Sequence, residues 1–99
     1  MGLSTPSENP AKTDLQNEIL ERASSASPKI LKRVEEMIIP KMQVFGPDME
    51  ERWLYELHND FYHLAEDPND PSGGGNYEGW TPEDIKGLYF VLYGEEMED

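Results

Sequence analysis

Apolar and polar residues alternate with a helical period over most of the chain. Between residues 13 and 24, apolar side chains recur every three or four positions, at Leu15, Ile19, Leu20 and Ala23. Thr13 and Gln16 have the spacing of a capping box, in which side chains satisfy the free backbone donors of a first turn. This pattern predicts a first helix over residues 13–24. Residues 1–12 are rich in Ser, Pro and Asn, and we expect them to form a flexible tail.

A second helix is predicted from Ser27 to Phe45. Ser27 suits the N-cap and Pro28 the first helical position. The apolar positions that follow keep the 3.6-residue period, at Ile30, Leu31, Val34, Met37, Ile38, Met42 and Phe45. Pro40 lies inside this run, and proline removes a backbone donor and clashes with the preceding turn. We therefore expect a kink near residues 36–40, or a split into two pieces.

The third predicted helix begins at Pro47 and has the strongest pattern. Placed at intervals of about 100°, its apolar side chains fall within one arc of about 120°, the width of a core-facing stripe; they are Trp53, Leu54, Leu57, Phe61, Leu64 and Ala65. A neighbouring stripe at the edge of this arc consists of Tyr55, His58 and Tyr62. Such side chains either cover the margin of a core or form a protein-binding patch, which Trp80 and Tyr77 would extend.

Residues 67–80 contain two prolines and four glycines and predict a long loop. After it, Thr81 suits an N-cap, Pro82 the first helical position and Asp84 the third residue of a capping box. The last helix then presents an apolar face until Gly94, formed by Ile85, Leu88, Tyr89 and Leu92. Residues 95–99 carry four acids and are expected to form an acidic tail.

These elements predict an all-α fold, a small bundle of about four helices with a long Gly-rich loop before the last helix and flexible termini. Residues 13–94 form the single helical domain, since 99 residues leave no room for a second one. The expected core consists of Leu15, Ile19, Ile30, Val34, Ile38, Met42, Trp53, Leu57, Phe61, Leu64, Ile85, Leu88 and Leu92.

Charge is divided unevenly along the chain. The net charge is −13, yet residues 1–47 hold six acids and six bases, and residues 48–99 hold fifteen acids with only Arg52 and Lys86 as bases. This excess opposes direct binding of nucleic acids and of anionic membranes. The chain has no cysteine, no apolar run of membrane-spanning length, and no apolar leader at its start, so we expect a cytoplasmic protein.

Catalytic and metal-binding signatures are weak in this sequence. No nucleophile and base pattern and no phosphate-binding loop is present, which favours a protein that is not an enzyme and needs no cofactor. His58 and His63 would lie about 140° apart on a helix and cannot share one ion. A calcium loop starting at Asp67 would place Pro71 at the fifth ligand position, so no metal site is predicted.

The acidic second half is the main functional clue. Arrayed carboxylates with a few aromatic side chains suit a protein that occupies a basic groove, such as that of a nuclease, polymerase or other nucleic-acid-binding protein, and inhibits it by imitating phosphate charge. The alternative is a small structural or adaptor subunit held by apolar contacts. The expected steering acids are Asp48, Glu51, Glu56, Asp60, Asp67, Asp70 and Glu78, and the expected anchors are Tyr55, Tyr62 and Trp80.

Overall fold

The computed structural model describes residues 14–97 and confirms the all-α prediction. Four helical units make up the bundle, and no strand occurs within the described range. Thr13, the tail 1–12 and the last two residues lie outside this range. The first unit, α1 (Asp14–Ser24), matches the predicted first helix at its C-terminal end.

A long helical column forms the second unit. It starts with α2 (Pro28–Arg33), where the Ser27 hydroxyl accepts a hydrogen bond from the Ile30 backbone at 3.3 Å, as expected of an N-cap. A π-helical segment (Val34–Ile38) follows and leads into α3 (Ile39–Phe45).

Pro40 explains the change of helix type. In an α-helix its ring would clash with the carbonyl four residues earlier, and its missing N–H would leave that carbonyl without a donor. In the π segment the backbone N–H of Ile39 instead donates to Val34, five residues back, which widens the helix just before the proline. The expected interruption is confirmed, and it takes the form of a π turn.

The second half of the chain contains α4 (Pro47–Glu66) and α5 (Pro82–Tyr93). Gly46 makes the turn into α4 with a φ of +80°, a conformation that costs glycine little. The predicted capping box of α5 is present: the Thr81 hydroxyl accepts from the Asp84 backbone at 3.1 Å, and the Asp84 carboxylate accepts from the Thr81 backbone at 3.0 Å.

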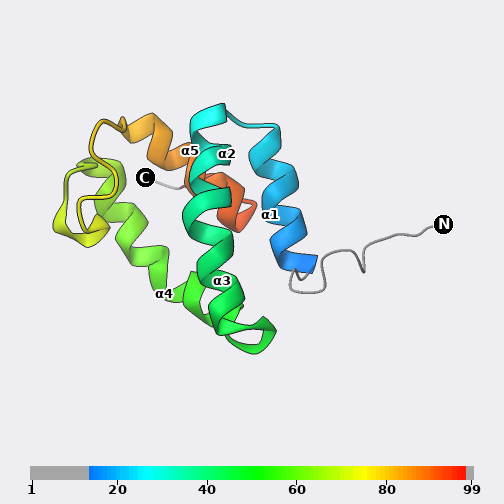
Figure 1. Cartoon of the computed structure of the whole chain (residues 1–99). Helices are drawn as coiled ribbons and strands as arrows, with labels where there is room; N and C mark the ends of the chain where they lie inside the picture. The colour runs from blue at the N-terminus through cyan, green and yellow to red at the C-terminus, as the bar shows by residue number, and fades with distance from the viewer. Residues whose placement is uncertain (1–13, 98–99) are drawn as a thin grey trace.

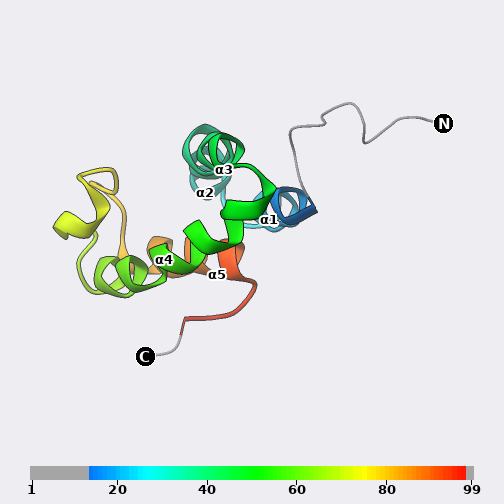
Figure 2. The ribbon, with the colours of Figure 1, turned by 90° about the horizontal axis from the view of Figure 1, so that it is seen from below.

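The units pack around one core. Figure 1 shows α2, the π segment and α3 as a continuous column, with α1 on one side and α4 running away from its lower end toward the loop. Seen from below, α4 and α5 lie together on one side of the column (Figure 2). The fully buried side chains come from every unit, and include Ile19, Val34, Met42, Phe61, Leu64, Ile85, Leu88, Val91 and Leu92.

Three features of the packing were not expected from the sequence. Tyr77 of the long loop is buried, because the loop folds back over Leu64 and Phe61 around a short 3-10 turn at Pro71–Gly73. Gln16, expected in a capping box, is buried and donates to Glu50 at 2.9 Å. Met97, placed in the acidic tail, packs against the core.

Candidate partner-binding surface

The predicted acids of α4 fall on two separate stripes of the helix. Residues three, four, seven or eleven positions apart share a face at 3.6 residues per turn. Asp48 and Glu51 lie in line with Tyr55 and Tyr62, and Glu56 and Asp60 lie in line with Met49 and Trp53. The carboxylates of α4 therefore border the helix on both sides of its buried face.

The predicted aromatic stripe is divided as well. Tyr55 is 79% exposed and makes no ring contact with another described residue. Tyr62 instead joins an aromatic cluster with His58 and Tyr89, with ring centroids 5.0–5.8 Å apart. The His58 Nε2 atom lies 2.7 Å from the Tyr89 hydroxyl. Tyr62 thus covers the edge of the core, and Tyr55 alone points away from it.

The acids of the loop differ in what they do. The Asp67 carboxylate accepts from the Asn69 backbone at 3.0 Å, and the Asp70 carboxylate accepts from the Ser72 backbone at 2.9 Å. The hydrogen bonds from Ser72 hold the pKa of the Asp70 carboxyl below its usual value. Both side chains therefore shape turns of the loop, while Glu78 is exposed.

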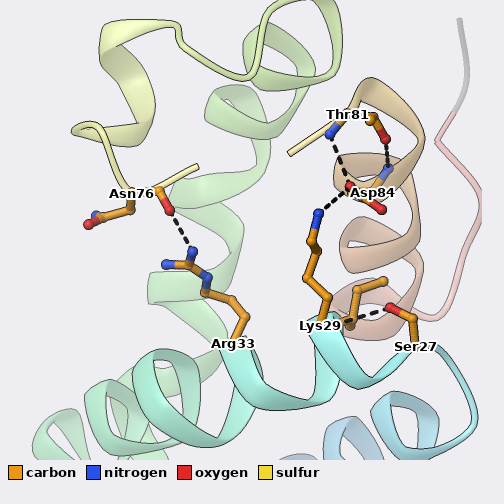
Figure 3. Close-up of polar contacts among 7 residues, drawn as sticks. Ser27, Lys29, Arg33, Asn76, Thr81 and Asp84 are labelled. Carbon is orange, nitrogen blue, oxygen red and sulfur yellow. Dashed lines mark hydrogen bonds and ion pairs between the residues drawn. The ribbon is translucent and has the colours of Figure 1, made fainter. Parts of the chain in front are cut away.

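Trp80 lies against two bases of α2 and against another aromatic ring of the loop. Its ring is 5.3 Å from the Lys29 ammonium, 5.2 Å from the Arg33 guanidinium and 5.3 Å from the Tyr77 ring. Arg33 also covers Tyr77 at 4.8 Å and donates to the Asn76 carbonyl (Figure 3). Cations over aromatic faces are attracted by the ring quadrupole. These contacts fasten the loop to α2.

Sequence reasoning missed this arrangement, although a signal for it exists. Lys29 and Arg33 are four residues apart and share a helix face, and Tyr77 and Trp80 are the aromatic side chains nearest the glycines of the loop. Lys29 also pairs with Asp84 at 2.9 Å (Figure 3). The backbone hydrogen bond from Thr81, and next the one from Lys29, hold the pKa of the Asp84 carboxyl below its usual value.

A groove of about 290 Å³ opens between the π segment and α3 on one side, α4 on the other, and the loop, and we call it the α3–α4 groove. Its buried lining is apolar, formed by Ile38, Phe61, Leu64 and Tyr77. More exposed side chains form its rim: Met37, Lys41, Trp53, Leu57 and Asp60. The groove therefore combines an apolar floor with one acid on the α4 side and one base on the α3 side.

Apolar surface continues from this groove to the turn between α3 and α4. The Trp53 ring lies 5.6 Å from the ring of Phe45, over which the Lys41 ammonium sits at 5.6 Å. Met49 and Val44 are exposed nearby, Val44 to 80%. Exposed apolar side chains gathered in one place are typical of interaction sites.

A larger hollow, of about 720 Å³, lies between α1 and α5. Its walls carry both signs of charge, with Glu21, Arg22 and Lys86 among them, and Met97 lines it from the end of the described chain. Arg22 is already engaged there, because it donates to the Val91 carbonyl at 2.8 Å. Its apolar lining, formed by Ala26, Phe90 and Met97, is exposed or half-buried, whereas the floor of the α3–α4 groove is buried.

Within residues 14–97, no group of three or more His, Asp or Glu side chains is arranged to hold a metal ion. No helix of the described range is long and apolar enough to cross a lipid bilayer. We found no family model, curated protein or solved structure that matches this chain.

Proposed function

We propose that this chain is a non-enzymatic binding module that docks through the carboxylates of its second half onto a basic surface of a partner protein. The supporting observation is a contrast between exposed acids of the second half and the bases of α2. Asp48, Glu51 and Glu78 are exposed and make no ion pair with another described residue. Lys29 and Arg33, in contrast, are turned toward the loop of their own chain.

Because these acids are exposed and these bases are engaged by the loop, the surface of the second half has a negative electrostatic potential. Carboxylates without nearby cations repel one another, and a basic partner relieves that repulsion as it docks. A protein surface that binds nucleic acid is basic, because its Lys and Arg side chains neutralise the negative charges of the phosphate backbone. The carboxylates of this chain present negative charge of the same kind. We infer that the chain competes with nucleic acid for such a surface and inhibits the partner.

Binding from cell lysate tests this proposal. The immobilised chain is loaded with native lysate and eluted with a salt gradient, with and without added duplex DNA, and the released proteins are identified and purified. We expect basic nucleic-acid-binding proteins that elute at moderate salt and are displaced by DNA, because screening weakens charge steering. A partner that resists both high salt and DNA would overturn the proposal.

Matched charge variants make this test specific. The triple variant Asp48→Asn, Glu51→Gln, Glu56→Gln removes three carboxylates from α4. The control Asp14→Asn, Glu18→Gln, Glu21→Gln removes three exposed carboxylates from α1 and changes the net charge equally. The purified partner should bind the α4 variant more weakly than the α1 variant. Equal losses for the two variants would mean that only total charge matters, not the acids of α4.

A second function is favoured by the exposed apolar side chains at the turn between α3 and α4. Val44, Phe45 and Met49 would be buried if the chain were a structural or adaptor subunit of a larger assembly. Apolar association tolerates salt, whereas charge-steered association does not. The salt gradient therefore separates the two functions.

A further inference from the structure

We propose that the α3–α4 groove receives the apolar side chains of a basic amphipathic helix of the partner protein, with the basic edge of that helix facing α4. This inference rests on the proposed function and identifies the site at which the partner is anchored. The groove has the form required for helix recognition, in which an amphipathic helix lays its apolar face on a groove between two helices.

The size of the groove decides how the partner helix would lie. A volume of about 290 Å³ is at the lower end of the range for ligand pockets, and is too small to enclose a helix. Large side chains from one face of the helix would enter the groove, and the helix would lie across its rim. Met37, Trp53 and Leu57 on the rim would then contact the apolar face on either side.

The charges at the rim decide which helix fits. Asp60 borders the groove on the α4 side, and Glu56, one turn away on the same stripe of the helix, pairs with Arg52 at 3.5 Å. Lys41 borders it on the α3 side. A helix with a base opposite Asp60 therefore satisfies the carboxylate that borders the groove. The net charge of −13 favours this cationic occupant over a second copy of the same chain.

A model peptide provides a direct probe. The peptide has about 18 residues, with leucine along one helical face and lysine elsewhere, and a scrambled peptide of equal composition is not amphipathic. The chain has two tryptophans, so the variant Trp80→Phe leaves Trp53 at the groove rim as the sole indole. We expect the amphipathic peptide to shift the emission of Trp53 to the blue, and the scrambled peptide to leave it unchanged.

Variants of the rim locate the binding site by fluorescence anisotropy of the labelled peptide. Asp60→Lys should weaken binding about tenfold, because it places a base opposite the basic edge of the peptide. Glu66→Lys, the same charge change at an exposed position of α4 outside the groove, should weaken it by much less. Lys41→Glu should strengthen binding, since it removes the base from the opposite rim.

An apolar pair of variants does not depend on Asp60. Met37→Lys introduces a charge at the rim, whereas Val44→Lys makes a similar change at an exposed apolar side chain outside the groove. Only Met37→Lys should reduce the affinity for the peptide. The circular dichroism spectrum of each variant is compared with that of the unmodified chain. Only variants that keep the helical fold are used to compare affinities.

The other outcomes overturn the inference in distinguishable ways. If Asp60→Lys and Glu66→Lys weaken binding equally and the emission of Trp53 stays unchanged, the groove is not the binding site. The proposed function would then remain, with the partner held by the overall negative charge of the second half. If neither peptide binds, both proposals fall. A concentration-dependent dimer in sedimentation, with a blue shift of Trp53 in the absence of peptide, would assign the groove to a second copy.

Discussion

The side-chain amide of Gln16 donates a hydrogen bond to the Glu50 carboxylate at 2.9 Å, and both side chains are buried, Glu50 to 3% exposure. This bond joins α1 to the first turn of α4 across 34 residues of sequence. Removing one partner would leave the other side chain buried without this bond. Such a loss costs more than the bond contributes by itself.

We predict that Gln16→Ala and Glu50→Ala each lower the free energy of unfolding by about 1–3 kcal/mol, measured by urea denaturation. The double variant should lose less than the two single losses added together, because the bond between the two side chains is already absent when the second substitution is made. Glu50→Gln keeps an acceptor oxygen and should be milder than Glu50→Ala. Strict additivity of the two alanine variants would contradict this coupling.

The capping box of α5 predicts a dependence of stability on acid. The pKa of Asp84 is lowered from its usual value of 3.8 in the folded protein, chiefly by the backbone hydrogen bond from Thr81. Its contribution to stability is therefore present above that value and is lost as the pH falls through the lower pKa of the folded state. Thermal melts should show the Asp84→Asn variant less stable than the unmodified chain at neutral pH.

The difference between Asp84→Asn and the unmodified chain should shrink below pH 3.8, where the unmodified carboxylate takes up a proton. Glu83→Gln is the matched control, because Glu83 is an exposed neighbour in the same first turn. Thr81→Ala should cost about 1 kcal/mol through loss of the N-cap. A gap between Asp84→Asn and the unmodified chain that stays constant from pH 7 to pH 2 would count against the acid linkage.

Arg33 should control the order of the long loop. Its guanidinium covers Tyr77 and Trp80 and donates to Asn76, so Arg33→Ala removes three contacts between the loop and α2. We expect faster proteolytic cleavage within residues 67–80 and faster hydrogen exchange there. Arg33→Lys keeps the charge but not the planar group, and should give an intermediate rate. Unchanged cleavage in Arg33→Ala would show that Arg33 does not control the order of the loop.

Tyr93 predicts a loss of stability in alkali. Its hydroxyl donates to the Leu54 carbonyl, and burial raises the pKa of this phenol above its usual value of 10.0. The phenol is therefore harder to ionise in the folded chain than in the unfolded chain. Its contribution to stability is full below pH 10 and declines above that pH, where Tyr93 ionises in the unfolded chain.

Tyr93→Phe should therefore cost about 1 kcal/mol at neutral pH, through loss of the hydrogen bond, and should reduce the decline in melting temperature between pH 9.5 and pH 11. Tyr55→Phe, at a 79% exposed position, is the control and should leave both quantities unchanged. The linkage would be refuted by an equal alkaline decline in Tyr93→Phe and the unmodified chain.

Periodicity was sufficient to predict which helical faces form the core. The expected core residues are buried or packed against the core. Apolar residues at helical spacing, such as Ile19 and Leu88, lie on one face of their helix, and this face is the one that packs against the other helices. Helix boundaries at Ser27 and Thr81 were also predictable, since their caps depend on residues three positions away.

Contacts between distant segments were not predictable in this way. A polar side chain such as Gln16 or Glu50 is expected at the surface, and only a partner 34 residues away makes its burial acceptable. Tyr77 was expected to extend a protein-binding patch, yet it is buried against the core. The acids of α4 could be named and their two stripes follow from helical spacing, but the groove beside Asp60 depends on how α3 and the loop pack.

The π segment keeps the long helical column in phase with the core. Ile30, Val34, Ile38 and Met42 are all buried at intervals of four residues. In a straight α-helix each such step would rotate the side chain by about 40°, which amounts to about a third of a revolution over the four positions. The wider turn at Val34–Ile38 takes up more residues per revolution and cancels much of this rotation. Because the π turn holds one residue more than an α turn, deleting one residue there would restore an ordinary α-helix and still leave Met42 facing the core.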